Sequence, residues 1–278
     1  MIFEDKKKKI YISAKKIEIG KDVSFVNNID IKVKGTFSIG DRSRLGTDVV
    51  IRGNNVKIGE DLFHSYGLRI GGGGSMHPNA NITIGNRCTI HNNFLNACEP
   101  IIIGNDVGLS EDVAIITHGY WLSVLEGQPA KFSGVTISDG VIIGYRTIIM
   151  MGVTIGRNVV IGANSVVTKN LAENSIYAGN PAKLLRKIEP ISKEKRPEKV
   201  KEVLAEYKKI SDYHGINPKI NFEYPKVYVN NCVFNVETLE CEGEEDLETD
   251  DFRDYVRKWG FRFYTKRPFR SVWDWNSF

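Results

Sequence analysis

The sequence is poor in cysteine, and this excludes several classes of protein. Four cysteines occur among 278 residues (Cys88, Cys98, Cys232 and Cys241), and no two of them form a Cys-x-x-Cys pair. Disulfide frameworks are typical of small secreted chains, and structural zinc sites need closely spaced ligand pairs. We therefore expect reduced thiols, a cytoplasmic protein and no bound metal.

Long apolar runs and a strong charge of one sign are also missing. No apolar segment approaches the roughly 20 residues of a membrane-spanning helix, so we expect no membrane span. The formal net charge of +4 is compatible with an anionic ligand. It does not indicate a nucleic-acid partner, because such proteins usually carry a concentrated basic face.

The sequence has instead a period of six residues. Within "ISDGVIIGYRTIIMMGVTIGRNVVIGANSVV", every sixth position is aliphatic: Ile137, Ile143, Ile149, Ile155, Ile161 and Val167. Helices repeat near 3.6 residues and strands near 2, so neither explains this spacing. Aliphatic–glycine pairs extend the pattern upstream, and self-similarity over such a length marks a solenoid.

A unit of six residues holds one short strand and one turn. Three units close a triangular coil of about 18 residues, with the aliphatic residue of each unit pointing inward. Glycine often follows that residue, which predicts a turn needing either little steric bulk or a positive φ. The pattern predicts a mainly β protein, a left-handed parallel β-helix. Its handedness comes from the hexapeptide signature, because the usual crossover rule favours the opposite hand.

Two segments interrupt the period. Between Ile58 and Ile84 the spacing exceeds 18 by eight residues, around "LRIGGGGSMHPN". Between Ile115 and Ile137 it exceeds 18 by four, around "THGYWLSVLEGQPAKFSG". Insertions in a solenoid emerge as loops at the corners, and such loops often carry binding or catalytic residues. The glycine run 71–74 lacks the ending of a phosphate-binding loop, so we expect a flexible corner loop there.

The period ends before residue 189, which predicts a β-helix domain over 1–188 and a small C-terminal α+β appendage over 189–278. Apolar residues recur at helical spacing early in the appendage, and two strand-like runs follow. The acidic segment after them predicts a short helix capped by Asp250 or Asp251.

A resemblance to a known family rests on residues 135–188, which read "VTISDGVIIGYRTIIMMGVTIGRNVVIGANSVVTKNLAENSIYAGNPAKLLRKI". This stretch resembles the closing segment of the hexapeptide-repeat acyltransferases, and is most similar to the galactoside, maltose and xenobiotic acetyltransferase branch. The resemblance covers 84–188 and extends through the repeat alone to the earlier coils. It implies an acetyl-CoA-dependent O-acetyltransferase acting on a hydroxyl of a sugar or polysaccharide precursor. The appendage is similar to tails of acetyltransferases of bacterial surface-polysaccharide synthesis.

The same resemblance implies a catalytic histidine. The family carries one after a repeat and just before an extended loop, and its equivalent here is His118 in "IITHGYW". Imidazole can accept the proton of a hydroxyl that attacks a thioester. By the same resemblance, the candidates for binding the acceptor are Asn92, Asn93, Tyr120 and Trp121.

Family members are homotrimers that bind acetyl-CoA in a groove between neighbouring prisms, so the resemblance implies a homotrimer with shared sites. The implied contacts of the coenzyme's pantetheine arm are Gly144, Met151, Gly152 and Ala163. Those of its nucleotide end are Thr168, Lys169, Lys183 and Arg186. Cations suit that end because the coenzyme carries several phosphate charges.

Three alternatives stay open. An N-acetyltransferase of a nucleotide-linked amino sugar needs the same donor and a similar base. A γ-type carbonic anhydrase uses the same prism with three metal-binding histidines, two of them five residues apart. No such spacing occurs among His64, His77, His91, His118 and His214. A non-catalytic solenoid scaffold is the third alternative.

Overall fold

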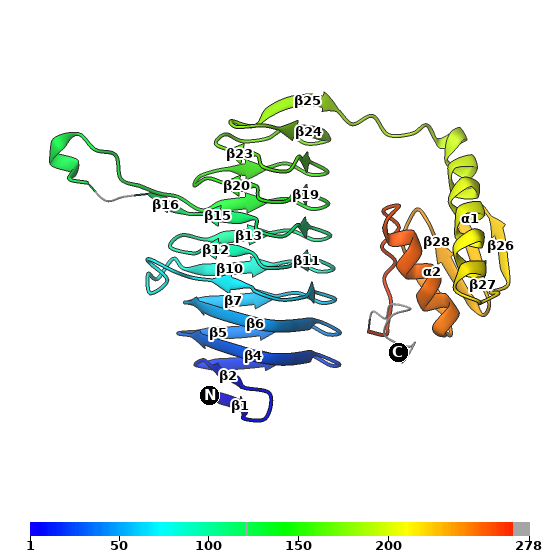
Figure 1. Ribbon diagram of the computed structural model, residues 1–278, viewed down its shortest axis with the longest axis horizontal. Coiled ribbons are helices and arrows are strands. Elements are labelled where there is room, and N and C mark those ends of the chain that lie inside the picture. Colours follow the sequence, from blue (N-terminus) through cyan, green and yellow to red (C-terminus); the bar gives the residue numbers. More distant parts are fainter. Residues whose placement is uncertain (120–121, 269–278) are drawn as a thin grey trace. The chain divides into compact units, whose positions relative to one another are not determined.

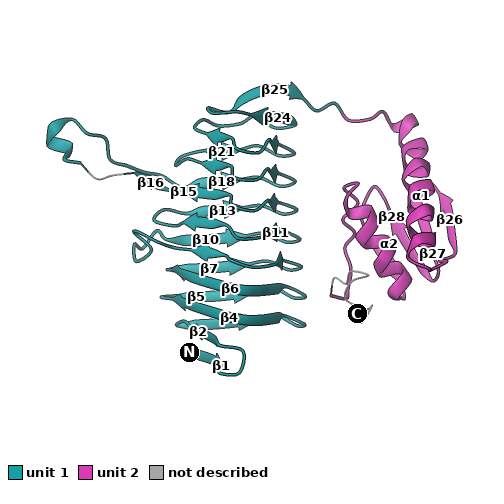
Figure 2. Cartoon of the chain, viewed as in Figure 1, with its two compact units in different colours: residues 1–189 teal, residues 190–278 magenta. Residues whose placement is uncertain are grey.

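The computed structural model describes residues 1–119 and 122–268. The chain forms two compact units, Met1–Glu189 and Pro190–Phe278, called unit 1 and unit 2 below (Figures 1 and 2). Tyr120 and Trp121, two of the acceptor candidates, lie outside the described residues.

Unit 1 is a parallel β-solenoid with three faces, as Figure 1 shows. The first face stacks β3 (Lys16–Ile19), β5 (Thr36–Ile39), β7 (Asn55–Ile58), β10 (Asn81–Ile84), β13 (Ile101–Ile103), β18 (Val135–Ile137) and β21 (Thr154–Ile155). The second stacks β8 (Phe63–His64), β11 (Thr89–Ile90), β14 (Gly108–Leu109), β19 (Ile142–Ile143), β22 (Val160–Ile161) and β24 (Ser175–Ala178). The third stacks β2 (Ile10–Ser13), β9 (Arg69–Ile70), β12 (Phe94–Asn96), β15 (Ala114–Ile116), β20 (Ile148–Ile149) and β23 (Val166–Val167).

Four longer or terminal strands complete the solenoid. β4 (Ser24–Val33) and β6 (Arg44–Gly53) each run through both the second and the third face. β1 (Ile2–Asp5) pairs antiparallel with β2, and β25 (Lys183–Lys187) pairs antiparallel with β24. Antiparallel strands thus cover both ends of the parallel stack.

The six-residue period forms the core. Ile137 lies in register with Ile155, 18 residues later, and Ile143 lies in register with Ile161. The inward column of the third face is no more than 1% exposed, and its members include Ile51, Ile70, Leu95, Ile115, Ile149 and Val167. The prediction of a left-handed β-helix is confirmed. One inward position of the second-face column is polar, because His64 occupies it and is 0% exposed.

The glycines that follow the first-face isoleucines are required by close approach between coils. A Cβ on Gly40 would lie 2.7 Å from the backbone nitrogen of Glu60, and one on Gly104 would lie 2.8 Å from that of Asp139. Neither glycine has a positive φ. The positive φ falls two positions later, for example at Arg42 (φ 57°). Glycine is therefore required at these positions because a side chain would collide with the next coil. The residue with a positive φ, two positions later, is polar.

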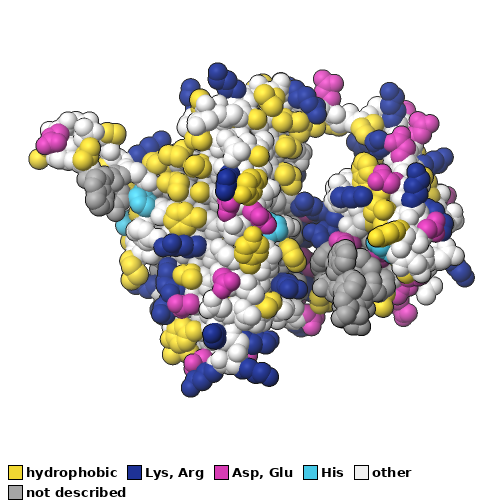
Figure 3. Space-filling model, viewed as in Figure 1, with side chains coloured by type: hydrophobic (Ala, Val, Ile, Leu, Met, Phe, Trp, Pro, Cys, Tyr) yellow, Lys and Arg dark blue, Asp and Glu magenta, His cyan; other side chains and the backbone are white. Residues whose placement is uncertain are grey.

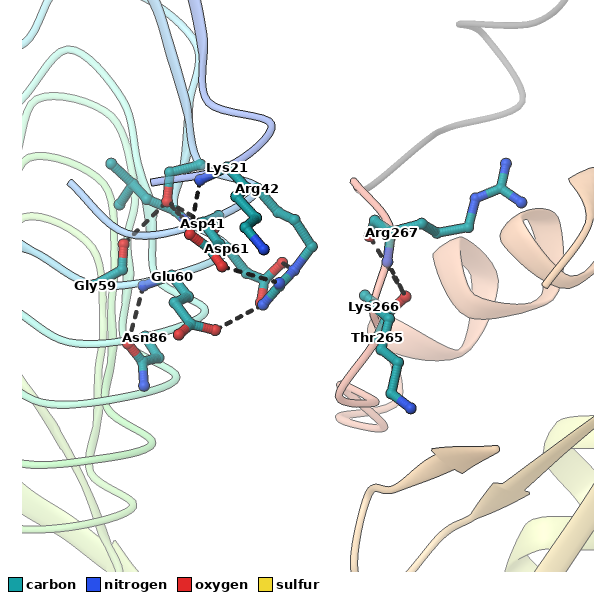
Figure 4. Close-up of polar contacts among 12 residues, drawn as sticks. Lys21, Asp41, Arg42, Gly59, Glu60, Asp61, Asn86, Thr265, Lys266 and Arg267 are labelled. Carbon is teal, nitrogen blue, oxygen red and sulfur yellow. Dashed lines mark hydrogen bonds and ion pairs between the residues drawn. The ribbon is translucent and has the colours of Figure 1, made fainter. Parts of the chain in front are cut away.

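Polar side chains tie this corner together from coil to coil (Figure 4). The backbone N–H of Lys21 donates to Oδ1 of Asp41 over 2.7 Å, and that of Glu60 donates to Asn86 over 2.9 Å. Arg42 donates to Asp61 over 2.9 Å, and this hydrogen bond raises the pKa of Arg42. These bonds satisfy N–H groups that the turn leaves without a strand partner.

Two insertions leave the coils. The first, residues 71–80, follows β9 and stretches the spacing from Ile58 to Ile84 to 26 residues. The second follows β15 and puts Ile103 in register with Ile137, 34 residues later. It is therefore 16 residues longer than a coil, not four as the sequence count predicted. That count was wrong because Ile115 lies on the third face and Ile137 on the first.

The second insertion is a hairpin that extends away from the coils in Figure 1. Its base pairs β16 (His118–Gly119) with β17 (Lys131–Phe132), and a short 3₁₀ helix, η1 (Val124–Glu126), lies between them. Four apolar side chains of the described part of the hairpin are exposed: Leu122 by 61%, Val124 by 61%, Leu125 by 95% and Phe132 by 49%.

Unit 2 is a small α+β unit. Its elements are η2 (Lys193–Lys195), α1 (Arg196–Tyr213), the antiparallel strands β26 (Ile220–Glu223), β27 (Lys226–Val229), β28 (Cys232–Asn235) and β29 (Cys241–Gly243), and α2 (Leu247–Arg257). Tyr207, Phe234 and Phe252 form the centre of its core. Neither α1 nor α2, the α-helices of the described residues, has the length and apolar character needed to cross a bilayer.

The cap expected for the second helix was wrong. α2 begins after Asp246, whose side chain accepts from the backbone N–H of Thr249 over 2.7 Å in a capping box. Asp250 and Asp251 lie inside the helix and are 0% and 2% exposed. They are available for buried ion pairs because Asp246 already satisfies the helix terminus.

Candidate active site

His118 lies where the hairpin leaves the third face of the solenoid. It follows β15 by one residue, Thr117, and pairs with Phe132 across the hairpin base. The two rings are stacked, with centroids 6.1 Å apart and planes 10° apart. The side chain is half-buried and its Nδ1 is buried, so strand pairing and ring stacking restrict the orientation of the imidazole.

Thr117, the residue before His118, anchors this corner. Its hydroxyl is buried, accepts from the backbone N–H groups of Cys98 (2.9 Å) and Glu99 (3.2 Å), and donates to the carbonyl of Asn96 (2.7 Å). The carbonyl of Thr117 accepts from the N–H of Ser133 over 3.0 Å. Neighbouring coils and the returning strand of the hairpin thus fix the backbone that carries His118.

The glycine-rich insertion folds toward the same imidazole. A Cβ placed on Gly73 would lie 3.5 Å from Nε2 of His118 and 3.7 Å from its Cε1. Gly74 has a φ of 83°, and a Cβ there would lie 2.4 Å from Sγ of Cys98, so this position requires glycine. Sequence reasoning did not find the contact between Gly73 and His118, because no periodicity relates the two insertions.

Four of the coenzyme candidates lie at the corner of His118, on the next two coils. Met151 and Gly152 follow β20, and Thr168 and Lys169 follow β23. A Cβ on Gly119 would lie 3.2 Å from the terminal methyl of Met151, so the hairpin base contacts that coil. Gly152, Thr168 and Lys169 are exposed.

The other coenzyme candidates lie elsewhere in the chain. Gly144 and Ala163 are together at the corner between the second and third faces, where a Cβ on Gly144 would lie 2.6 Å from the nitrogen of Ala163. Lys183 and Arg186 are exposed on β25, which pairs with β24 of the second face. Within one chain, therefore, the structure does not bring all eight coenzyme candidates together.

The asparagine candidates lie at the opposite end of the third face from His118, because they precede β12 whereas His118 follows β15. Asn93 is 1% exposed; its oxygen accepts from the N–H of His91 (2.8 Å) and its amide donates to the carbonyl of Ser110 (2.7 Å). These two hydrogen bonds explain by themselves why an asparagine occupies position 93, without a role in binding the acceptor. Asn92 is half-exposed and donates to Asp112.

One further histidine was not singled out from the sequence. Nδ1 of the buried His64 accepts from the backbone N–H of Gly46 over 3.0 Å. Burial lowers the pKa of His64 to about 4. The imidazole is therefore neutral at physiological pH, and its place in the aliphatic column is structural. Within the described residues, no group of three or more His, Cys, Asp and Glu side chains is arranged to hold a metal ion.

Comparisons with known proteins agree with this architecture. Residues 134–169 match the model of the bacterial transferase hexapeptide family (six repeats). Protein CapG of Staphylococcus aureus is 37% identical over 134 residues, which are 47% of this chain and 69% of that protein. Galactoside O-acetyltransferase of Escherichia coli is 32% identical over 139 residues, 49% of this chain and 63% of that enzyme.

A similar solved structure is that of a hexapeptide-repeat acetyltransferase of Vibrio cholerae, VCA0836, complexed with acetyl coenzyme A. It is 30% identical over 39% of this chain and 61% of that one, with a TM-score of 0.37. The three-sided coil and the curated relatives define the class: the chain belongs to the hexapeptide-repeat transferase family. It is thus an enzyme, and its matches span about two thirds of these relatives' own length.

Proposed function

We propose that this protein is an acetyl-CoA-dependent O-acetyltransferase acting on a hydroxyl of a sugar or polysaccharide precursor, with His118 as general base. The observation that carries the proposal is the position of the half-buried His118 imidazole. It lies at a coil corner beside Gly73, the exposed Gly152 and the exposed Thr168–Lys169 corner. The names of relatives support the substrate class, among them a galactoside O-acetyltransferase.

The chemistry needs one proton acceptor. The acceptor hydroxyl attacks the thioester carbonyl, and Nε2 of His118 takes the hydroxyl proton as the new C–O bond forms. The tetrahedral intermediate then collapses, the C–S bond breaks, and the proton on the imidazole passes to the departing thiolate. General base assistance of this kind is worth about 10²–10⁴-fold in rate.

The coenzyme would lie along the corner that carries Met151, Gly152, Thr168 and Lys169. Exposed backbone there can pair with the amides of the pantetheine arm. The ammonium of Lys169, together with Lys183 and Arg186, would face the phosphates of the nucleotide end.

We propose a homotrimer in the cytoplasm. Gly144 and Ala163 lie at a different corner from His118, so a second copy would have to bring the two groups of candidates together. Exposed apolar side chains on the coils are available for burial between copies, as Figure 3 shows; Ile102 is 48% and Ile148 38% exposed. The four cysteines, all among the described residues, form no disulfide, which supports a reducing compartment.

N-acetylation of a nucleotide-linked amino sugar is the second candidate. Its support is a relative named 2,3,4,5-tetrahydropyridine-2,6-dicarboxylate N-acetyltransferase, from Staphylococcus saprophyticus, 39% identical over 92 residues. An amine acceptor would use the same donor and the same base, so the two candidates differ in acceptor alone.

The test is thiol release from acetyl-CoA with sugars, nucleotide-linked amino sugars and polysaccharide fragments as acceptors. We expect turnover with a hydroxyl acceptor and a 10²–10⁴-fold lower kcat in His118→Ala, at about unchanged coenzyme affinity. The matched control is His77→Ala, because this imidazole is exposed in the glycine-rich insertion. Activity of His118→Ala within severalfold of wild type would remove His118 from the mechanism. Turnover with amino sugars alone would favour the second candidate.

A further inference from the structure

Unit 2 contains a pocket that the proposed acetyl transfer does not use. Its volume is about 370 Å³, and all its lining residues belong to unit 2. The start of α1, the turn between β26 and β27, and the segment after α2 form its walls. The size falls in the range of small-molecule sites.

One wall of the pocket is aromatic. Trp259, Phe261 and Tyr224 all line it, and Trp259 is 42% exposed. The exposed part of this indole offers apolar area that a ligand in the pocket can bury. Flat rings offer a surface to the C–H faces of a pyranose, which are the apolar part of a sugar.

The pocket lining also contains a polar group, the carboxylate of Glu237 with its hydrogen-bond partners. Oε1 of Glu237 accepts from the hydroxyl of Tyr224 over 2.6 Å and from Nη1 of Arg196 over 2.9 Å. These bonds, that of Tyr224 first, lower the pKa of Glu237 and hold its carboxylate in one orientation. Oε2 of Glu237 and Nη2 of Arg196 take no part in these two hydrogen bonds. One acceptor and one donor are thus fixed side by side, as vicinal hydroxyls require.

Two cations line the pocket, Arg196 and Lys199, together with one carboxylate, that of Glu237. Nζ of Lys199 also pairs with Glu202 of the same helix, so Arg196 and Lys199 each have a carboxylate partner. A ligand with a carboxylate would gain a charge-assisted hydrogen bond to the guanidinium, whereas an uncharged one would not.

From the aromatic wall, the Glu237–Arg196 pair and the two cations of the lining, we infer that this pocket binds an acidic saccharide, with a sugar ring against Trp259 and its carboxylate at Arg196 and Lys199. This role goes beyond acetyl transfer and does not depend on it: unit 2 would hold a glycan chain whatever reaction unit 1 performs.

The experiment measures binding to the full-length protein, without acetyl-CoA, by calorimetric titration. One probe is a hyaluronan hexasaccharide, which carries glucuronate; the other is chitohexaose, which has the same number of sugar rings and no carboxylate. We expect the acidic probe to bind at least about tenfold more tightly. Trp259→Ala should weaken both probes at least tenfold, and Trp259→Phe should retain much of the affinity because it keeps a ring.

Matched controls separate the pocket from general surface effects. Arg196→Gln should reduce binding of the acidic probe more than that of chitohexaose, because it removes the partner of the carboxylate as well as one donor to hydroxyls. Lys201→Gln, an exposed cation of the same helix outside the pocket, should alter neither. Tyr213→Ala removes an aromatic side chain that is 85% exposed and does not line the pocket, and should bind as wild type.

Three results would overturn the inference: no binding of either probe at millimolar concentration, equal binding by Trp259→Ala and wild type, or equal affinity for both probes with no effect of Arg196→Gln. Binding should persist in His118→Ala. Failure of the proposed catalytic role of His118 and failure of the proposed saccharide site are therefore distinguishable.

Discussion

Unit 1 and unit 2 bury different kinds of side chain. In the described part of unit 1, one buried side chain comes from the group of His, Asp, Glu, Lys and Arg, and it is His64. Unit 2, less than half as long, buries Asp250, Asp251 and Arg253. A repeated coil can satisfy its polar groups at exposed corners, whereas the single small core of unit 2 has charged groups inside it.

The buried charges of unit 2 form a network. Arg253 contacts Glu245 over 2.6 Å and Asp250 over 3.0 Å, and Asp250 also contacts Arg267 over 2.9 Å. Asp251 accepts from the hydroxyl of Tyr207 over 3.0 Å. The comparison therefore predicts that the stability of unit 2 falls when one buried charged group is removed. The stability of unit 1 should fall when an inward side chain changes shape or becomes charged.

The largest expected effect is that of Arg253→Met. The change leaves the carboxylates of Asp250 and Glu245 with less compensation in a dry site, and should lower the free energy of unfolding of unit 2 by about 3–5 kcal/mol. Urea unfolding followed by circular dichroism and tryptophan fluorescence would measure it. Lys209→Met, on the exposed side of α1, is the control and should change stability by less than about 0.5 kcal/mol. Equal stability of the two variants would show that the buried charges do not stabilise unit 2 and would contradict the proposed difference between the units.

The next effect concerns His64. Its pKa is lowered to about 4 in the folded state, from 6.5 for an exposed histidine. Between these values the unfolded chain binds more protons, so stability falls as the pH drops from 6.5 toward 4, by about 2 kcal/mol between pH 7 and pH 5. His64→Leu restores an aliphatic column and should remove this part of the pH dependence. Parallel stability–pH curves for the two proteins, measured by urea unfolding, would contradict the assignment.

A loss of similar size is expected from Thr117→Val, which keeps the shape of the side chain and removes its hydroxyl. The buried N–H of Cys98 and the carbonyl of Asn96 then lose a partner, at a cost of about 2 kcal/mol. Thr117→Ser keeps the hydroxyl and is the control. Thermal unfolding reports the loss, and turnover would test whether this residue also positions His118; a shift equal to that of Thr117→Ser would argue against the anchoring role.

The smallest effect is expected from Gly73→Ala. The added methyl would lie 3.5 Å from Nε2 of His118, where an acceptor oxygen must approach, and Gly73 does not need a positive φ. We expect kcat/KM to fall by about tenfold with unchanged stability. Met76→Ala, at an 82% exposed position of the same insertion, should retain activity. Full activity of Gly73→Ala in the thiol-release assay would place the acceptor on another side of the imidazole.

Much of the solenoid could be predicted because its rule is local and repeated. Each step of six residues turns one corner, so a position such as Ile149 is specified by its neighbours in sequence. The same count separates Gly144 from Met151, because six residues from Gly144 lead to Met150 at the next corner. The sequence alone therefore places Gly144 and Met151 at different corners, whereas the resemblance to the family groups them in one coenzyme site.

The sequence by itself determined the columns, the two insertions and the position of His118 at the start of one of them. Only the tertiary structure decided that Gly73 lies against this imidazole and that the side chain of Asn93 is used in hydrogen bonds to His91 and Ser110. The tertiary structure also decided that Glu237, Arg196 and Trp259 line one pocket. The physical reason is that stacking of identical steps follows from a period. Contacts between insertions, and within a small mixed core, depend on side chains far apart in sequence that no period relates.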